Sequence, residues 1–166
     1  YLGSCVDSDN GLAQNVAADS DDSAVATGTT YGTCSAASDD EDGVIFSPLA
    51  TNTSSPIIVT TSAACRLDAW IDYNKDGDFI DTGEQIFTNK LLLGGTNYLS
   101  ISVPAGASTG DTYSRFRCST AGKLSSTGLA TDGEVEDYKI NISNTAPTFD
   151  FSDAPDSDPA IVPHAY

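Results

Sequence analysis

The sequence predicts an all-β protein built as an antiparallel β-sandwich of the jelly-roll or immunoglobulin-like kind. Between residues 44 and 143, short runs of β-branched and aromatic residues alternate with Gly, Pro and Ser turns. No segment carries the 3.6-residue apolar period of an amphipathic helix. Many short strands without helices are typical of a sandwich whose apolar faces bury each other.

The expected strands are short, and several alternate apolar with polar residues. Leu67, Ala69 and Ile71 share one face of the segment 65–71, which leads directly into an acidic loop. Segment 98–103 alternates equally clearly. The expected strands cover residues 44–46, 57–61, 65–71, 85–88, 91–93, 98–103, 112–118 and 135–142.

Composition divides the 166 residues into one domain and two flanking segments. Residues 1–43 are acidic and rich in Gly, Ser and Ala, and we expect them to form a loop-rich segment packed on the sandwich. Residues 44–143 form the predicted sandwich. Residues 144–166 contain four prolines and indicate an acidic linker or the start of a further repeat.

Strong negative charge restricts the partners that the protein can have. The formal net charge is −17, from 24 acidic and 7 basic side chains, and 20 of the acids are Asp. Such a surface disfavours nucleic acid and anionic membrane as partners, and no apolar run is long enough to insert into a bilayer. Because Asp favours turns and metal loops over helices, the acids indicate bound cations.

Four widely spaced cysteines predict disulfides and an oxidising, extracellular compartment. There is no Cys-x-x-Cys pair, and the lone His164 lies in the proline-rich tail, which disfavours zinc. Four cysteines allow three pairings. We favour Cys65–Cys118, because both flank predicted strands, and Cys5–Cys34, which would close the N-terminal segment. Free buried thiols are the alternative.

The strongest candidate site is the loop at residues 72–84, where five carboxylates and one amide fall within thirteen residues. Oxygen ligands at this density suit Ca²⁺, which takes six to eight of them. The loop begins like an EF-hand, but its twelfth position is Gly83 and no helices flank it. We predict a calcium loop between two strands, the alternative being a solvated acidic turn. Its predicted ligands are Asp72, Asn74, Asp76, Asp78 and Glu84.

Further acidic groups predict more than one calcium ion. Glu134 and Glu136 share the parity of the apolar residues in the last expected strand, so they should point inward. Buried carboxylates need a cation or a guanidinium, which Arg115 or Arg117 could supply. For the acids that precede the first expected strand, a solvated run is the alternative. The added candidate ligands are Asp7, Asp9, Asp39, Asp40, Asp42, Glu134 and Glu136.

The sequence lacks a recognisable catalytic set, and we predict that the protein is not an enzyme. Its single histidine lies outside the predicted sandwich, and neither a Gly-x-Ser-x-Gly elbow nor a phosphate-binding glycine loop occurs. Pairs of carboxylates could serve glycoside hydrolysis, but nothing separates such a pair from the many candidate metal ligands.

The stretch Gly133-Glu-Val-Glu-Asp-Tyr138 resembles the motif that names the bacterial GEVED-domain family. The resemblance extends over roughly residues 39–143 and includes the stretches at residues 69–78 and 113–117. It implies a secreted or cell-surface β-sandwich module of long, often adhesin-like multidomain proteins, without established catalytic residues. The four cysteines, and Tyr73 where Trp is common, depart from the family pattern.

The two ends of the chain resemble parts of one acidic segment that precedes such domains. Residues 150–157 are similar to its opening, and residues 6–11 are similar to its later part. We therefore hypothesise that the chain is one unit of a tandem array whose neighbours contact end to end.

These observations predict a calcium-stabilised structural repeat of an extracellular bacterial adhesin or filament, acting in surface attachment or in fibre and matrix assembly. Its partners would be neighbouring copies and, for an adhesin, surface glycan. The alternative is a carbohydrate-binding module of a secreted multidomain protein, for which Trp70, Tyr73 and Tyr113 are candidate exposed aromatics. For Trp70, which shares a face with Arg66 and Asp68, packing in the core is the interpretation that we favour.

Overall fold

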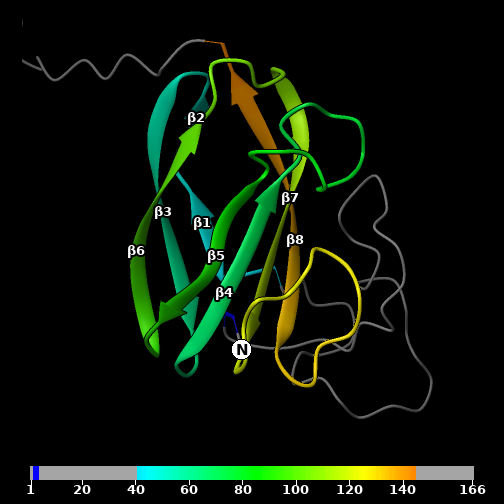
Figure 1. Ribbon diagram of the computed structural model, residues 1–166. Helices are drawn as coiled ribbons and strands as arrows, with labels where there is room; N and C mark the ends of the chain where they lie inside the picture. Colours follow the sequence, from blue (N-terminus) through cyan, green and yellow to red (C-terminus); the bar gives the residue numbers. More distant parts are fainter. Residues whose placement is uncertain (1, 4–40, 145–166) are drawn as a thin grey trace, which may run out of the picture.

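Two β-sheets make up the part of the chain that the structure describes. The computed structural model describes residues 2–3 and 41–144, which contain eight strands and no helix (Figure 1). The predicted all-β class is confirmed. The strands are β1 (Val44–Phe46), β2 (Leu49–Ala50), β3 (Thr53–Thr61), β4 (Cys65–Ile71), β5 (Gln85–Leu92), β6 (Gly95–Val103), β7 (Gly110–Ser119) and β8 (Glu134–Ser143).

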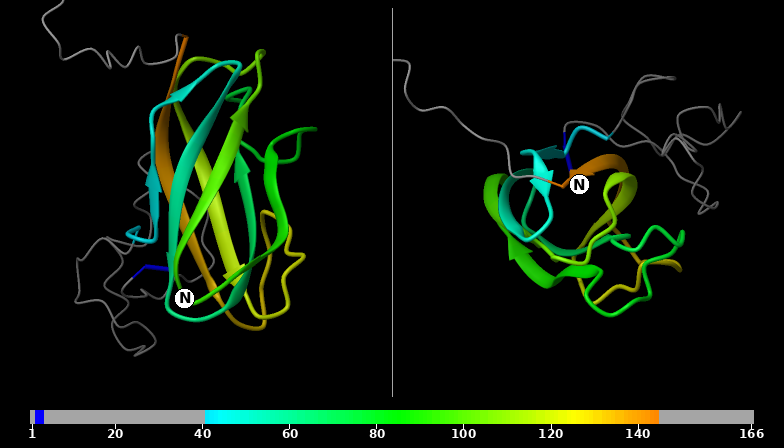
Figure 2. Two further views of the ribbon diagram at one scale, coloured as in Figure 1. Left: turned by 90° about the vertical axis from the view of Figure 1, so that its left-hand side faces the viewer. Right: turned by 90° about the horizontal axis from the view of Figure 1, so that it is seen from above.

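The sheets have three and five strands, in the orders β1-β3-β6 and β2-β8-β7-β4-β5. They pack face to face, as the side and end-on views show (Figure 2). Neighbouring strands are antiparallel except for the short β2, which runs parallel to β8 and pairs Leu49 with Ile142. The expectation of a purely antiparallel sandwich is corrected by this one pair.

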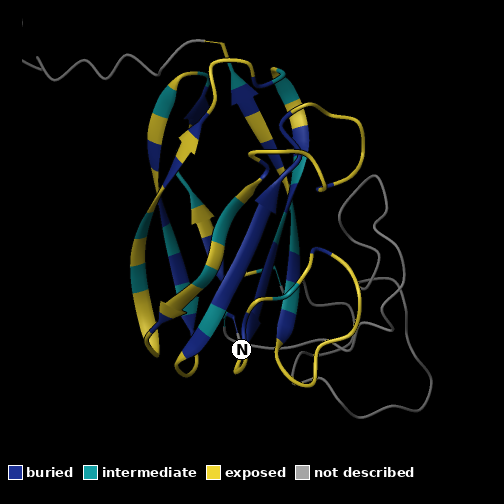
Figure 3. Cartoon of the chain, viewed as in Figure 1, coloured by how far each residue is buried: buried dark blue, intermediate teal, exposed yellow. Residues whose placement is uncertain are grey.

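The core lies between the sheets and follows the alternation of apolar residues along each strand. Ile57 of β3 and Leu67 of β4 are fully or almost fully buried, and β4 is buried along nearly its whole length (Figure 3). The rings of Phe46, Phe116 and Tyr138 meet edge to face with centroids 5.5, 5.7 and 5.9 Å apart. This aromatic cluster ties the two sheets together.

Several observed strands extend beyond the expected ones, and the central strand of the smaller sheet shows why. β3 begins at Thr53 rather than at residue 57, and it includes Pro56. Pro56 lies one position outside the β1 ladder, which ends at the pair of Phe46 with Ile57, so its missing N–H interrupts no strand pair. The sequence does not predict β2, because two residues carry no periodicity.

The expected strands 85–88 and 91–93 are one strand, β5, with a bulge, so the prediction of two strands is wrong. Asn89 has a positive φ of 51° at the point where the register against β4 shifts. The buried carboxylate of Asp68 accepts hydrogen bonds from the N–H of Asn89 at 2.7 Å and of Leu124 at 3.0 Å. Asp68 therefore joins the bulge to the loop between β7 and β8.

A disulfide joins the neighbouring strands β4 and β7. Cys65 and Cys118 are bonded, with their Cα atoms 5.8 Å apart, which confirms this predicted pair. The predicted bridge Cys5–Cys34 lies outside the described residues, as do most of the predicted N-terminal segment and residues 145–166. Within the N-terminal segment, Leu2 is fully buried and forms a bridge with Thr61.

Candidate metal centre

The loop of residues 72–84 joins β4 to β5 and is anchored at its base by backbone hydrogen bonds. The N–H of Ile71 donates to the carbonyl of Glu84 at 2.9 Å, which closes the loop. The N–H of Asp72 donates to the carbonyl of Tyr113 on β7 at 3.0 Å. Both ends of the loop are thus fixed to the five-stranded sheet.

The buried carboxylate of Asp72 organises the first half of the loop. Its Oδ1 accepts the N–H of Lys75 at 2.6 Å, and its Oδ2 accepts the N–H of Gly77 at 3.0 Å. The chain turns sharply to bring these donors inward, and Lys75 and Gly77 have positive φ angles of 66° and 94°. Asp72 therefore receives backbone donors on both oxygens, and its part in binding a metal stays a prediction.

Glu84 organises the second half of the loop in the same way. Its side chain is buried, with Oε1 accepting the N–H of Tyr73 at 3.0 Å and Oε2 accepting the N–H of Asp81 at 3.3 Å. Burial raises the pKa of Glu84, and these backbone donors act against the rise. The predicted closing ligand thus lies inside the loop, and its role as a ligand also stays a prediction.

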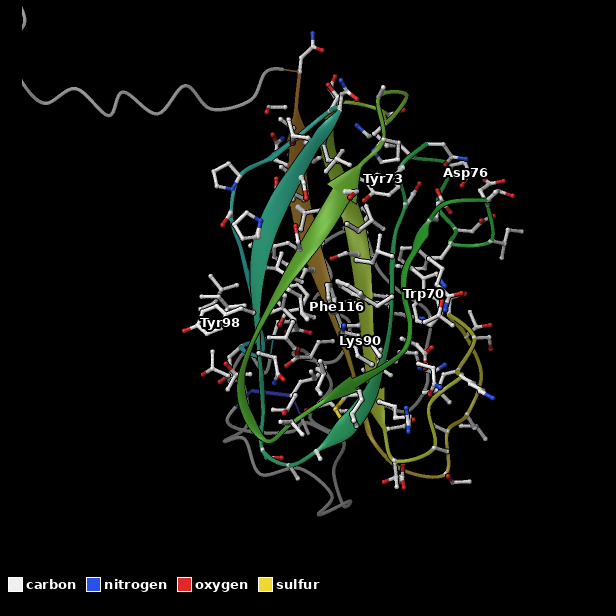
Figure 4. All side chains as sticks on the ribbon, turned by 60° about the vertical axis from the view of Figure 1, so that its left-hand side comes forward. Trp70, Tyr73, Asp76, Lys90, Tyr98 and Phe116 are labelled. Carbon is white, nitrogen blue, oxygen red and sulfur yellow. A yellow bond between two sulfur atoms is a disulfide. The ribbon has the colours of Figure 1, made fainter. Side chains whose placement is uncertain are left out.

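Three exposed carboxylates come together on the solvent side of the loop. Oxygen atoms of Asp76, Asp78 and Asp81 lie within 4.8 Å of one another. Asn74 lies beside them and donates from Nδ2 to Asp76 at 2.9 Å and to Asp81 at 2.6 Å. We call these four residues the oxygen cluster. Figure 4 shows Asp76 on the outer part of the loop, away from the sheets.

The oxygen cluster has the donor chemistry of a site for a hard cation. Three carboxylates and a side-chain amide are the kinds of ligand that calcium takes. Asp76 and Asp78 lie together, as their spacing indicates. Asp81 is a candidate ligand that the sequence reading misses, although it is one of the five carboxylates in the loop. It falls three residues after Asp78, off the alternate-residue spacing on which the prediction depends.

Glu134 and Glu136 point inward, as their parity predicts, and are 8% and 0% exposed. Glu136 accepts hydrogen bonds from the N–H of Gly43 at 3.1 Å and from the hydroxyl of Tyr138 at 2.8 Å. Glu134 accepts one from the N–H of Leu2. Burial raises the pKa of Glu136 to about 8, and the neighbouring Glu134 adds to the rise. The metal-binding roles of both glutamates stay predictions.

The guanidinium alternative for these two glutamates is wrong. Glu136 pairs with Phe116 across the sheet, and both are buried, so the neighbouring Arg115 and Arg117 lie on the opposite face. Arg115 binds Asp137 there through hydrogen bonds of 2.6 and 2.8 Å. Arg117 donates to three carbonyls of the loop between β7 and β8 and so holds that loop against the sheet.

Two of the three aromatics considered for glycan binding are buried. Trp70 is 4% exposed and Tyr73 is 6% exposed, whereas Tyr113 is partly buried. Tyr73 packs within the hydrophobic core, and its hydroxyl donates to the carbonyl of Ser102 at 3.2 Å. The burial of Trp70 agrees with the interpretation that we favour for it, and the alternative of an exposed aromatic platform at Trp70 and Tyr73 is wrong.

The remaining predicted ligands belong to the N-terminal segment. Asp42 is exposed. Asp7, Asp9, Asp39 and Asp40 lie outside the described residues, so their role as ligands stays a prediction.

Two packed sheets, a disulfide and an acidic loop between β4 and β5 define a small disulfide-linked β-domain with a candidate cation site. Residues 66–141 match the family model described as the GEVED domain. This match confirms the resemblance to the GEVED-domain family over these residues. The match runs from β4 to β8 and contains the whole 72–84 loop.

Among solved structures, the chain is similar to a family 123 glycoside hydrolase from Clostridium perfringens, studied for glycolipid glycan hydrolysis, with 14% identity and a TM-score of 0.30. The similarity covers 58% of this chain and 22% of the hydrolase chain, so the chain spans about a fifth of that protein. At this TM-score the likeness supports no statement about function. No curated protein matches the chain. Over the described ranges, no helix has the length and apolar character needed to cross a bilayer.

Proposed function

We propose that the chain is a calcium-stabilised structural module of an extracellular bacterial adhesin or filament. The observation that carries the proposal is the oxygen cluster, in which three exposed carboxylates gather within 4.8 Å on a loop that buried acids hold in shape. Carboxylates this close repel one another, and a divalent cation bound among them replaces the repulsion with attraction.

The proposed ligands are the three carboxylates of Asp76, Asp78 and Asp81, with Asn74 presenting its amide oxygen. The amide of Asn74 already reaches two of these carboxylates through its nitrogen. A half-turn of the amide would direct its oxygen to the same place, in exchange for the hydrogen bond that this oxygen accepts from the N–H of Asp76. Asp72 and Glu84 act as supports, because their hydrogen bonds fix the loop backbone before an ion arrives.

Other features support an extracellular, structural role. The Cys65–Cys118 disulfide is typical of proteins that reside in oxidising compartments. A net charge of −17 destabilises a compact chain by self-repulsion unless cations offset it. The proposed partners are neighbouring copies that contact end to end and, for an adhesin, a surface glycan.

Thermal unfolding in calcium and in EDTA tests the calcium site. We expect the Tm to fall in EDTA, because calcium at a hundredfold excess over its Kd contributes about 2.7 kcal/mol for each site. Asp81→Asn should remove much of this difference. Asp132→Asn, which changes an exposed acid outside the loop, should retain it. An identical Tm in calcium and in EDTA would overturn the proposal. If Asp81→Asn and Asp132→Asn reduced the calcium-dependent difference in Tm equally, the calcium site would not lie in this loop.

The tandem arrangement has a separate test. The intact mass of the native protein in its source should correspond to several units of this length. A native chain that ends at the 166 residues would contradict the array and leave the calcium site untouched.

A further inference from the structure

The three-stranded sheet carries no charge. Its strands β1, β3 and β6 contain no Asp, Glu, Lys or Arg, although the chain has 24 acidic and 7 basic side chains. All seven basic residues lie in the five-stranded sheet or in loops. In a protein with a net charge of −17, this sheet is the surface that another acidic molecule can approach with the least repulsion.

The strand β6 forms an open edge of this sheet. Among the described residues it pairs with β3 alone, and it lies at the left-hand margin of the strands in Figure 1. The backbone groups of Thr60 in β3 point away from β6. The N–H of Thr60 donates to the carbonyl of Gly43, and its carbonyl accepts the N–H of Gly3. The pair of Thr60 with Thr96 therefore exchanges no backbone hydrogen bonds, and the backbone groups of Thr96 point to the open edge.

Tyr98, Ser100 and Ser102 follow Thr96 at every second position, so their backbone N–H and carbonyl groups also point to this edge. The carbonyl of Ser102 accepts the hydroxyl of Tyr73 at 3.2 Å, which agrees with that direction and covers one end of the edge. The open stretch is therefore residues 96–100, and it is centred on Tyr98.

β6 lacks the features that usually protect an open edge strand. It contains no charged residue and no proline, and its register with β3 is continuous from Gly95 to Val103, without a bulge. The corresponding edge of the larger sheet is β5, which has a bulge at Asn89 followed by Lys90. The contrast indicates that β6 is open for pairing with another strand.

We propose that β6 pairs antiparallel with β6 of a second copy of this chain, side by side, about a two-fold axis at Tyr98. This register joins Thr96 to Ser100 of the other copy and Tyr98 to its own counterpart, and it forms about six backbone hydrogen bonds, two for each pair. The contact is self-complementary, as a two-fold interface requires. It goes beyond the proposed function, in which neighbours contact end to end.

Side chains on the outer face support this partner. Ile45, Ile58 and Tyr98 form one row across the sheet, because Ile45 pairs with Ile58 and Ile58 pairs with Tyr98. Ile45 is 61% exposed and Tyr98 is 79% exposed, and the Tyr98 ring points away from the sandwich (Figure 4). Two-fold pairing continues the row into the second copy and brings the two tyrosine rings together.

Sedimentation velocity of the full chain over a range of concentrations, at constant calcium, tests the pairing. We expect a reversible dimer for the natural sequence and for Tyr98→Phe. Tyr98→Pro removes an edge N–H without breaking the β3 ladder, and Tyr98→Lys places like charges across the axis, so each should weaken the dimer by about tenfold or more. Leu129→Lys changes a fully exposed loop residue and should leave the dimer unchanged.

Amide hydrogen exchange locates the contact. As the concentration rises, the amides of Thr96, Tyr98 and Ser100 should gain protection, whereas that of Leu99, which faces β3, should not change. A chain that stays monomeric at millimolar concentration would overturn the proposal. A dimer that persists in both Tyr98→Pro and Tyr98→Lys would also overturn it.

Discussion

At the scale of single residues, buried carboxylates are the main polar feature of the fold. Asp68, Asp72, Glu84 and Glu136 are at most 3% exposed, and each accepts two hydrogen bonds, mostly from backbone N–H groups. A buried polar group that loses its partner costs about 1–3 kcal/mol, and more when it is charged. Each carboxylate therefore fixes the backbone segment that it binds.

Asp68→Asn should destabilise the fold by about 1–3 kcal/mol. The two oxygens of Asp68 accept from Asn89 and Leu124, and an amide replaces one acceptor with a donor that faces an N–H. Urea unfolding measures the loss. The control is Asp132→Asn, because that carboxylate is exposed and water can replace its bond to the N–H of Thr120. Similar losses in the two variants would contradict the importance of burial at Asp68.

The stability of the protein should fall as the pH rises from about 4.5 to about 8. The pKa of Glu136 is raised from 4.5 to about 8 in the fold, so the native state binds more protons than the unfolded state between these values. Glu136→Gln should flatten this dependence, since its oxygen can still accept from Gly43 and its amide can donate to Tyr138. Unfolding free energies of both proteins near the two pH limits, in EDTA, measure the effect. A pH profile that the substitution leaves unchanged would rule out Glu136 as its source.

At the scale of elements, the alternation of apolar residues predicts a strand wherever one face is buried. The expected segment 65–71 is strand β4, with the predicted boundaries. The bulge in β5 cannot be predicted in this way, because it depends on Asp68, which meets Asn89 only after β4 and β5 have paired. The pairing of β2 with β8 likewise depends on residues far apart in the sequence.

The candidate site shows the same division between local and distant information. Acids at alternate positions locate the loop, because carboxylate density is a property of the sequence. Which oxygens face solvent depends on the turns at Lys75 and Gly77, which direct both oxygens of Asp72 to backbone donors. Asp81 joins the oxygen cluster because the chain folds back on itself, with the carboxylate of Glu84 receiving the N–H of Asp81.

Gly77→Ala should cost about 1 kcal/mol. Gly77 has a φ of 94°, but no atom lies within 4 Å of the position that a Cβ would take, so the cost is conformational. Gly106→Ala is the matched control, because the space there is equally open and its φ is not in the left-handed region. Urea unfolding at fixed calcium compares the two. Equal changes would show that the turn at Gly77 contributes nothing specific.

At the scale of the whole molecule, the two sheets differ in charge and in covalent linkage. The three-stranded sheet has neither a charged residue nor a cysteine. The five-stranded sheet carries five of the seven basic residues and the Cys65–Cys118 disulfide. We therefore expect association between copies to depend on the first sheet and resistance to unfolding to depend on the second.

Replacing Cys65 and Cys118 together by Ala should lower the free energy of unfolding by about 4 kcal/mol. The bridge spans 53 positions of the sequence, and its loss restores the chain entropy of that loop to the unfolded state. Urea unfolding measures the loss. A parallel variant with Cys5 and Cys34 replaced by Ala shows how much the other cysteines contribute. A loss below about 1 kcal/mol would contradict a stabilising role for the bridge.

The same bridge determines how the domain would extend under tension. When the chain is pulled from both ends with the disulfide intact, only residues outside the covalent ring closed by Cys65 and Cys118 can extend. The segment between them, a sequence separation of 53 positions and about 180 Å of contour length, cannot extend while the bond is intact. The whole 72–84 loop lies within that ring, so its acids remain tethered near one another after the strands part. In a fibre, a reducing agent would then lengthen each unit at a force that otherwise leaves the ring closed.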